Sequence, residues 1–292
     1  MKSNLPVTKG MIFAGCSFTW GQGLYYYSNL PTLQEPKPCC YDADIVRYTH
    51  YEYTKTKRFA RLVANHFNTF EVCQPFNGGA TYSIADWWNQ CFSNVNERDK
   101  SLNGDWLYPK YDYSDFSHII YQFTQWTRSR SPAMIVPNSD GAIVQNCHIN
   151  CMQHEDFDKW LIDNNMTPEE YVVKGLQQDI EDVKKFLRKF EDNGVKAYVL
   201  SWPFDIVPYI LKDPWLSERF ITFKYKNIEY TNMEHMMGFQ HQKVTEVLHP
   251  ELTINRDIEN FEFPPYDWHP SLTCHRVVAD TIINHIEKNE ST

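Results

Sequence analysis

Glycine is scarce in this chain of 292 residues, which has only 11, against 16 prolines, 18 tyrosines and 18 phenylalanines. We therefore expect long, ordered loops rich in aromatic residues, and no segment has the composition of a disordered tract. Runs of about 18 apolar residues are also missing, so the sequence predicts no transmembrane helix and no membrane partner. With 42% hydrophobic residues, the chain has enough apolar surface for a large core.

An excess of positive charge is missing as well, since the formal net charge is −9 at pH 7. Affinity for nucleic acids rests largely on lysine and arginine side chains that neutralise phosphates, so no nucleic-acid partner is expected. One local group of basic residues is interpreted as the solvated face of a helix: Lys55, Lys57, Arg58 and Arg61.

The first ten residues, MKSNLPVTKG, lack the apolar stretch of a secretory signal peptide. The eight cysteines are then expected to be free thiols in a reducing compartment, and the predicted location is the cytoplasm.

The segment CHINCMQH contains four zinc-capable residues, Cys147, His148, Cys151 and His154. Their spacing matches no recognised zinc motif, so we interpret them as packing residues and predict neither a metal site nor a cofactor.

Four short apolar segments, each bounded by turn residues, have the composition of buried strands: residues 11–15, 70–73, 118–123 and 195–201. Apolar residues at helical spacing predict three helices: residues 55–68, 167–193 and about 272–288. The second helix begins with a capping box at Thr167 and Glu170, has proline at its first position, and stops at Gly194.

Strands that alternate with helices predict a three-layer α/β/α sandwich. Its sheet is expected to be mostly parallel and flavodoxin-like, with about five strands. We treat residues 1–292 as one domain. Two aromatic-rich stretches without clear periodicity, residues 23–54 and 129–165, are interpreted as insertions over the carboxyl edge of the sheet, the second as an insertion or lid within the domain. Residues 202–265 are expected to hold short helical pieces at best.

Ser17, in GCSFTWGQG (residues 15–23), follows the first predicted strand, where functional residues of parallel sheets collect. Asp267 and His269 lie two positions apart in YDWHPS, so in an extended loop they project to the same side. The aspartate can then accept a hydrogen bond from one imidazole nitrogen and leave the other free to take a proton. Because a serine hydroxyl needs such a base, the three residues are candidates for a triad, with a simple turn serine as the alternative.

Together these segments resemble the SGNH (GDSL-like) hydrolase superfamily, nearly end to end, and in particular a divergent branch encoded by tailed phages. GCSFTWG is similar to the family's first block, with cysteine in place of aspartate, NGGATYS (residues 77–83) to its second, and DWHPS to its last. The resemblance implies that Ser17 is the nucleophile, His269 the base and Asp267 its orienter. Gly78 or Gly79, with the Ser17 N–H, would bind the oxyanion.

The third block departs from the family pattern, Gly-x-Asn-Asp, because QFTQWTR (residues 122–128) has no asparagine. Gln125 or Thr124 could donate to the oxyanion instead, and a missing donor costs about 10²–10³ in turnover. Cys16 is not expected to be the nucleophile, because adjacent strand residues face opposite ways.

Three tryptophans lie within a few residues of the blocks and either line an acyl or sugar pocket or pack in the core: Trp20, Trp126 and Trp268. Arg128 either binds a substrate carboxylate or phosphate or forms a structural ion pair. His275, in the first turn of the last helix, is expected on the helix surface or at the edge of the site.

The predicted function is a serine-dependent esterase that cleaves small O-acyl esters, with carbohydrate esters preferred, through an acyl-enzyme. Two alternatives remain open: an acyltransferase with the same triad, and a catalytically silent binding module on the same scaffold, because a fold does not fix a function. The sequence does not indicate the oligomeric state.

Overall fold

The computed structural model describes residues 9–16, 19, 21, 24, 55–73, 81–92, 110–124, 135–137, 143–145, 159, 161–225, 227–236, 270 and 272–291. Within these ranges, the central sheet has four parallel strands in the order β2-β1-β3-β6. They are β1 (Gly10–Ala14), β2 (Glu71–Cys73), β3 (Phe116–Phe123) and β6 (Lys196–Ser201). A single parallel bridge joins Val199 to Phe220 beyond β6. This order matches the first four strands of flavodoxin-like sheets.

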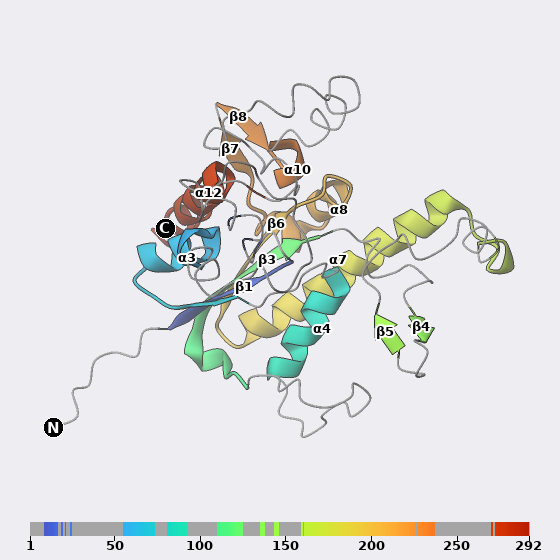
Figure 1. Ribbon diagram of the computed structural model, residues 1–292, viewed down its shortest axis with the longest axis horizontal. Coiled ribbons are helices and arrows are strands. Elements are labelled where there is room, and N and C mark those ends of the chain that lie inside the picture. Colours follow the sequence, from blue (N-terminus) through green and yellow to red (C-terminus); the bar gives the residue numbers. More distant parts are fainter. Residues whose placement is uncertain are drawn as a thin grey trace, which may run out of the picture.

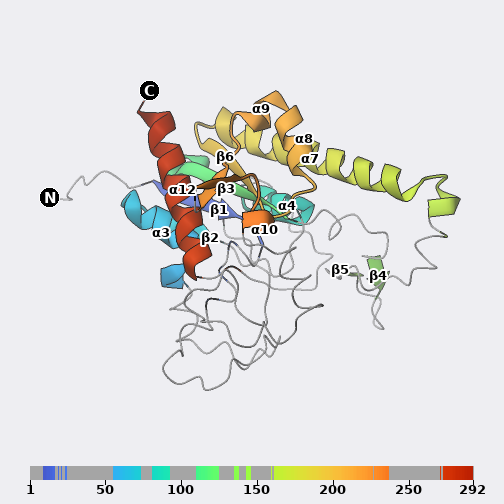
Figure 2. The ribbon, with the colours of Figure 1, turned by 90° about the horizontal axis from the view of Figure 1, so that it is seen from above.

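Helices cover both faces of the sheet (Figures 1 and 2). One layer contains α3 (Phe59–His66) and α12 (Leu272–Glu290), and the other contains α4 (Thr81–Phe92) and α7 (Pro168–Asp192). The chain moves outward from β1 to β2 through α3 and returns past β1 to β3 through α4, so right-handed crossovers place the two helices on opposite faces. The predicted three-layer α/β/α class with a parallel sheet is confirmed.

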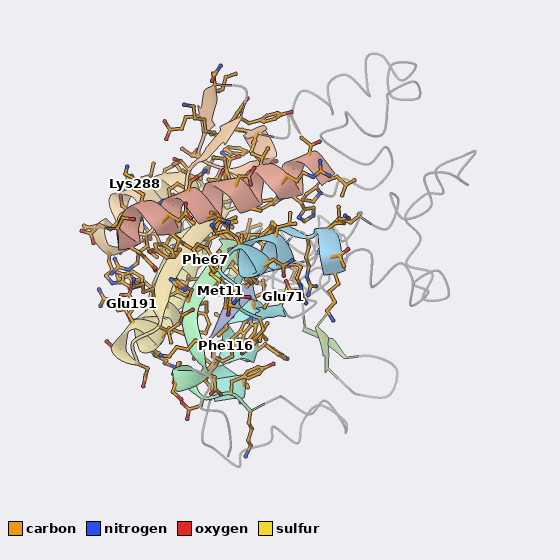
Figure 3. All side chains as sticks on the ribbon, turned by 90° about the vertical axis from the view of Figure 1, so that its left-hand side faces the viewer. Met11, Phe67, Glu71, Phe116, Glu191 and Lys288 are labelled. Atoms are coloured by element: carbon orange, nitrogen blue, oxygen red, sulfur yellow. The ribbon has the colours of Figure 1, made fainter. Side chains whose placement is uncertain are left out.

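Apolar side chains fill both interfaces between the sheet and the helices. All five residues of β1 are buried, and Phe13 contacts Phe59 of α3 with ring centroids 6.1 Å apart. On the opposite face, the ring centroid of Phe92 in α4 lies 4.9 Å from that of Phe190 in α7 and 5.8 Å from that of Phe116 in β3. Each such buried side chain stabilises the fold by roughly 1.5–3 kcal/mol, which fixes the strands that lead to the candidate site. In Figure 3, α12 lies alongside α3.

The predicted boundaries agree with the structure to within two residues for the four strands and for α7 and α12. The capping box of α7 is present: Thr167 Oγ1 accepts from the Glu170 N–H at 3.2 Å, and the Glu170 carboxylate accepts from the Thr167 N–H at 2.9 Å. Gly194, with φ of +79°, follows the end of the helix. The helix predicted over residues 55–68 is interrupted at Arg58, whose backbone is extended, so α3 begins only at Phe59.

Several elements were not predicted. Helix α4 was missing from the predicted set, as were two antiparallel pairs, β4 (Ile135–Pro137) with β5 (Ile143–Gln145) and β7 (Phe223–Tyr225) with β8 (Ile228–Tyr230). The short helical pieces expected after residue 202 are present as α8 (Val207–Lys212), α9 (Pro214–Ser217) and α10 (Met233–Met236). A one-turn 3-10 helix, η3 (Tyr113–Asp115), precedes β3. The division into one domain with an insertion or lid at 129–165 stays a prediction.

Across the described ranges, no helix combines the length and apolar character needed to cross a membrane.

Candidate active site

Ten of the residues predicted for the site lie outside the described residues. They are Ser17, Asp267 and His269 of the triad, Gly78, Gly79 and Gln125 of the oxyanion site, and Trp20, Trp126, Arg128 and Trp268 of the substrate site. The cysteines and histidines of residues 147–154 also lie outside them. Their roles stay predictions, and the described residues next to them in the chain define the surroundings.

The chain immediately after β1 is tightly held. Cys16 is buried, and the Thr19 N–H donates to the Cys16 carbonyl oxygen at 3.0 Å, so this hydrogen bond joins the residues on either side of Ser17 and Phe18. A Cβ added to Gly15 would lie 2.0 Å from Thr19 Oγ1 and 2.8 Å from Thr19 Cβ. Glycine is therefore required at position 15, because the Thr19 side chain occupies the space beside it.

Gln122 of β3 binds both residues that this hydrogen bond joins, Cys16 and Thr19. Its Oε1 accepts a hydrogen bond from Thr19 Oγ1, and its Nε2 donates to Cys16 Sγ at 3.4 Å. The exposed fractions of Gln122 and Thr19 are both 1%. Gln122 was not identified from the sequence as a site residue, although a polar side chain in the apolar strand FSHIIYQF was a usable signal.

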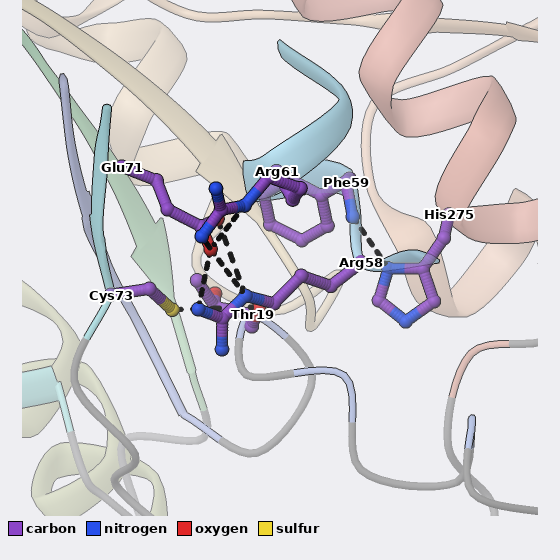
Figure 4. A network of polar contacts seen from close by, with 7 residues as sticks. All are labelled: Thr19, Arg58, Phe59, Arg61, Glu71, Cys73 and His275. Carbon is purple, nitrogen blue, oxygen red and sulfur yellow. Dashed lines mark hydrogen bonds and ion pairs between the residues drawn. The ribbon is translucent and has the colours of Figure 1, made fainter. Parts of the chain in front are cut away.

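Cys73, the last residue of β2, holds the same turn from the other side. Its Sγ donates to the Thr19 carbonyl oxygen at 3.7 Å (Figure 4). Burial raises the pKa of the Cys73 thiol to about 12; the Arg58 charge lowers it and the Glu71 charge raises it further. The thiol is thus protonated near neutral pH and acts as a donor, not as a nucleophile, since only a thiolate is strongly nucleophilic.

A buried ion pair lies beside this thiol. Arg58 Nη2 lies 2.6 Å and Arg61 Nη2 2.9 Å from the same oxygen, Oε1 of Glu71 (Figure 4). The Glu71 and Arg58 side chains are only 1% and 3% exposed. The interpretation of the basic group as a solvated helix face is therefore wrong for Arg58: its backbone interrupts the helix, and a carboxylate from β2 binds its guanidinium.

His275 ties the beginning of α12 to α3. The Phe59 N–H donates to His275 Nδ1 at 3.2 Å, and the two rings stack with centroids 5.6 Å apart. The first N–H groups of a helix have no partner within it, and Arg58 gives α3 no side-chain cap, so this imidazole serves as one. His275 is fully buried, which corrects its expected place on the helix surface. Asp267 and His269 precede α12 by a few residues in the sequence, and the first turn of that helix is held against α3 by His275.

The start of α4 is joined to the end of β3. Thr81 Oγ1 accepts from the Thr124 N–H at 3.2 Å and donates to the Thr124 carbonyl oxygen at 3.1 Å. Tyr121 Oη also donates to the Thr81 carbonyl oxygen at 2.5 Å. The segment with Gly78 and Gly79 ends just before Thr81, and Gln125 directly follows Thr124 in the sequence. Two chain segments that the sequence analysis linked to the oxyanion are thus anchored together at their described ends.

The parts of the chain that the structure covers contain no group of three or more histidine, cysteine, aspartate or glutamate side chains arranged to hold a metal ion.

No family model and no curated protein matches the chain. Among solved structures, the chain is similar to a carbohydrate esterase described as having divergent catalytic and non-catalytic binding functions in its active site, with 13% identity and a TM-score of 0.42. It is also similar to an acetyl xylan esterase from the rumen bacterium Butyrivibrio proteoclasticus, with 13% identity and a TM-score of 0.43. The two matches cover 96% and 99% of this chain but only 65% and 66% of the other chains, just under two thirds of their length.

Proposed function

We propose that the protein is a serine-dependent esterase of the SGNH type with Ser17 as its nucleophile. One observation carries the proposal: Cys16 and Thr19, which flank the turn containing Ser17, are buried at the carboxyl end of β1 and bound to the neighbouring strand. Catalytic residues of parallel α/β sheets come from this edge. The order of the other sequence blocks along the chain supports the same assignment.

In the proposed reaction, Ser17 Oγ attacks the ester carbonyl while His269 takes its proton and Asp267 holds the imidazole. The Ser17 N–H and the N–H of Gly79 or Gly78 bind the oxyanion, with Gln125 or Thr124 replacing the missing asparagine. The tetrahedral intermediate expels the alcohol, which receives the proton from His269. Water, activated by the same imidazole, then releases the acid and restores Ser17.

The proposed substrate is a small O-acyl ester on a carbohydrate. Sugar and acyl groups both pack well on aromatic rings, and 15% of the residues are aromatic. Trp20, Trp126 and Trp268 are the proposed lining residues, and Arg128 is the proposed partner of a substrate carboxylate or phosphate. The absence of an asparagine in the third block favours a second candidate, a binding module that retains the fold without turnover.

A fluorophosphonate probe, which reacts only with an activated serine, tests the nucleophile. We expect the wild type and Ser114→Ala, which changes an exposed serine before β3, to be labelled, and Ser17→Ala to be unlabelled. Well-folded wild type that remains unlabelled would contradict the esterase and favour the binding module. Product analysis of an acetyl ester with and without an acceptor sugar separates hydrolysis from acyl transfer, because only a transferase places the acyl group on the acceptor.

A further inference from the structure

Gln122 is a buried amide at the carboxyl end of β3, in a strand that is otherwise mostly apolar. Buried amides are retained where their donor and acceptor are both satisfied. Here the acceptor binds Thr19 and the donor binds Cys16. These partners lie 103 and 106 positions away in the sequence, and both belong to the short stretch that contains Ser17.

Thr19 is held at three of its groups. Its N–H donates to the Cys16 carbonyl oxygen, its carbonyl oxygen accepts from the Cys73 thiol, and its hydroxyl donates to Gln122. A Cβ on Gly15 would also lie 3.0 Å from Gln122 Cβ, so glycine at this position lets the strand approach the amide closely. The described residues nearest Ser17 on either side, Cys16 and Thr19, are therefore both bound by Gln122.

We propose that Gln122 is a positioning residue for Ser17. The amide acts by binding Cys16 and Thr19, the described residues on either side of Ser17 and Phe18. The serine matters twice in the proposed reaction, because it supplies both the attacking hydroxyl and one oxyanion N–H. This inference rests on the proposed function, because it takes Ser17 as the nucleophile. Misplacing a reacting group by about 1 Å can cost about 10²-fold in rate.

Replacing the amide by a side chain of similar length tests the role. In Gln122→Met we expect the fluorophosphonate labelling rate and the kcat for an acetyl ester to fall by about 10- to 100-fold. KM should stay near the wild-type value, because substrate contacts are unchanged. The pH profile of kcat/KM should keep its midpoint, because the amide is proposed to act on the serine turn and not on the general base.

Thr19 offers an independent pair of variants if Gln122→Met does not fold. Thr19→Val keeps the shape but removes the hydroxyl that binds Gln122, and it should slow labelling by a similar factor. Thr19→Ser restores that hydroxyl and should recover most of the rate. Ile120→Val is the matched control, since it trims a buried apolar residue of the same strand and leaves the Gln122 amide in place, and it should be labelled at the wild-type rate even where the Tm is lowered.

The two proposals fail in different ways. Wild-type rates in both Gln122→Met and Thr19→Val, with labelling still lost in Ser17→Ala, would overturn the positioning role and leave the esterase intact. A rise in KM with kcat unchanged would also overturn it, because that result indicates a role in substrate binding. No labelling of the folded wild type would overturn both proposals.

Discussion

At the scale of single residues, Glu71 is the centre of a buried ion pair. Two arginines share one of its oxygens in a place almost closed to water. Removing one partner of a buried ion pair costs more than the pair itself contributes, because the remaining charge has already lost its hydration.

Glu71→Gln should therefore lower the free energy of unfolding by about 3 kcal/mol, since the Arg58 guanidinium stays buried without its carboxylate. Urea unfolding measures the change. Glu181→Gln is the control, because the Glu181 side chain, which pairs with Lys184, is 64% exposed. This substitution should change the free energy of unfolding by less than about 0.5 kcal/mol. Equal losses in the two variants would show that burial does not determine the strength of the Glu71 interaction.

At the scale of elements, the N-terminal turn of α7 depends on its cap. Glu169 and Glu170 are exposed and Val173 is 38% exposed, whereas the buried residues of the helix begin at Gly175. Tertiary packing thus secures the later turns, and the capping box secures the first.

Thr167→Ala should remove about 1 kcal/mol of local stability, which is roughly a fivefold increase in opening of the first turn. Hydrogen exchange of the amides of residues 169–171 reports this directly, while the amides near Phe186 should exchange as in the wild type. Thr167→Ser, which keeps the capping oxygen, should keep the wild-type pattern. Faster exchange along the whole helix in Thr167→Ala would indicate that the cap stabilises more than the first turn.

The elements that could be predicted are those whose signals are local. Residues 167–193 contain a cap, an apolar stripe and a stop, and β1, β3 and β6 are apolar runs between turns. Helix α4 was missed because its first residues, TYS, also belong to a glycine-containing block, and the preceding residue in the sequence, Ala80, is not of a type favoured as a helix cap. The β7–β8 pair was missed because its strands have only three residues each.

The surroundings of the candidate site were beyond sequence reasoning for a different reason. The contacts of Gln122 with Thr19 and of His275 with Phe59 join residues 103 and 216 positions apart, and no periodicity encodes such pairs. Likewise, the sequence predicts an exposed Arg58, because nothing local indicates that Glu71 of β2 lies beside it. The assignments of Ser17, Asp267 and His269 depend on motif resemblance and remain predictions.

At the scale of the whole molecule, the end of α12 is bound to the amino ends of two central strands. Glu290 Oε1 lies 2.6 Å from His118 Nε2 of β3 and 2.9 Å from Lys196 Nζ of β6. Burial, together with the Lys196 charge, lowers the pKa of His118 more than the Glu290 contact raises it. Burial raises the pKa of Glu290, but its contacts with Lys196 and His118 outweigh this and lower it overall. His285 of the same helix also has a lowered pKa, from burial and then from Lys288.

These shifts predict that acid destabilises the fold. A histidine whose folded pKa lies below its ordinary 6.5 binds more protons when unfolded, so stability falls as the pH drops below that value. The lowered Glu290 pKa adds a further loss of stability below its ordinary value of 4.5.

Urea unfolding at a series of pH values tests this prediction. His118→Gln should reduce the slope of the free energy of unfolding against pH between about pH 6.5 and pH 5. Ser117→Ala removes the hydroxyl beside His118 Nδ1, 2.9 Å away, and should keep the slope. An unchanged slope in His118→Gln would contradict the assignment.

The position of β1 in the sheet also matters while the chain is being made. β1 pairs with β2 on one side and with β3 on the other, and about 100 residues separate Ala14 from Phe116. At about 5–20 residues per second, a ribosome needs roughly 5–20 s to supply the second partner. For that time the apolar segment GMIFA has an unpaired edge, which is a hazard for association between nascent chains. Production of this protein should therefore benefit from lower temperature or added chaperones more than that of a protein whose first strand pairs only locally.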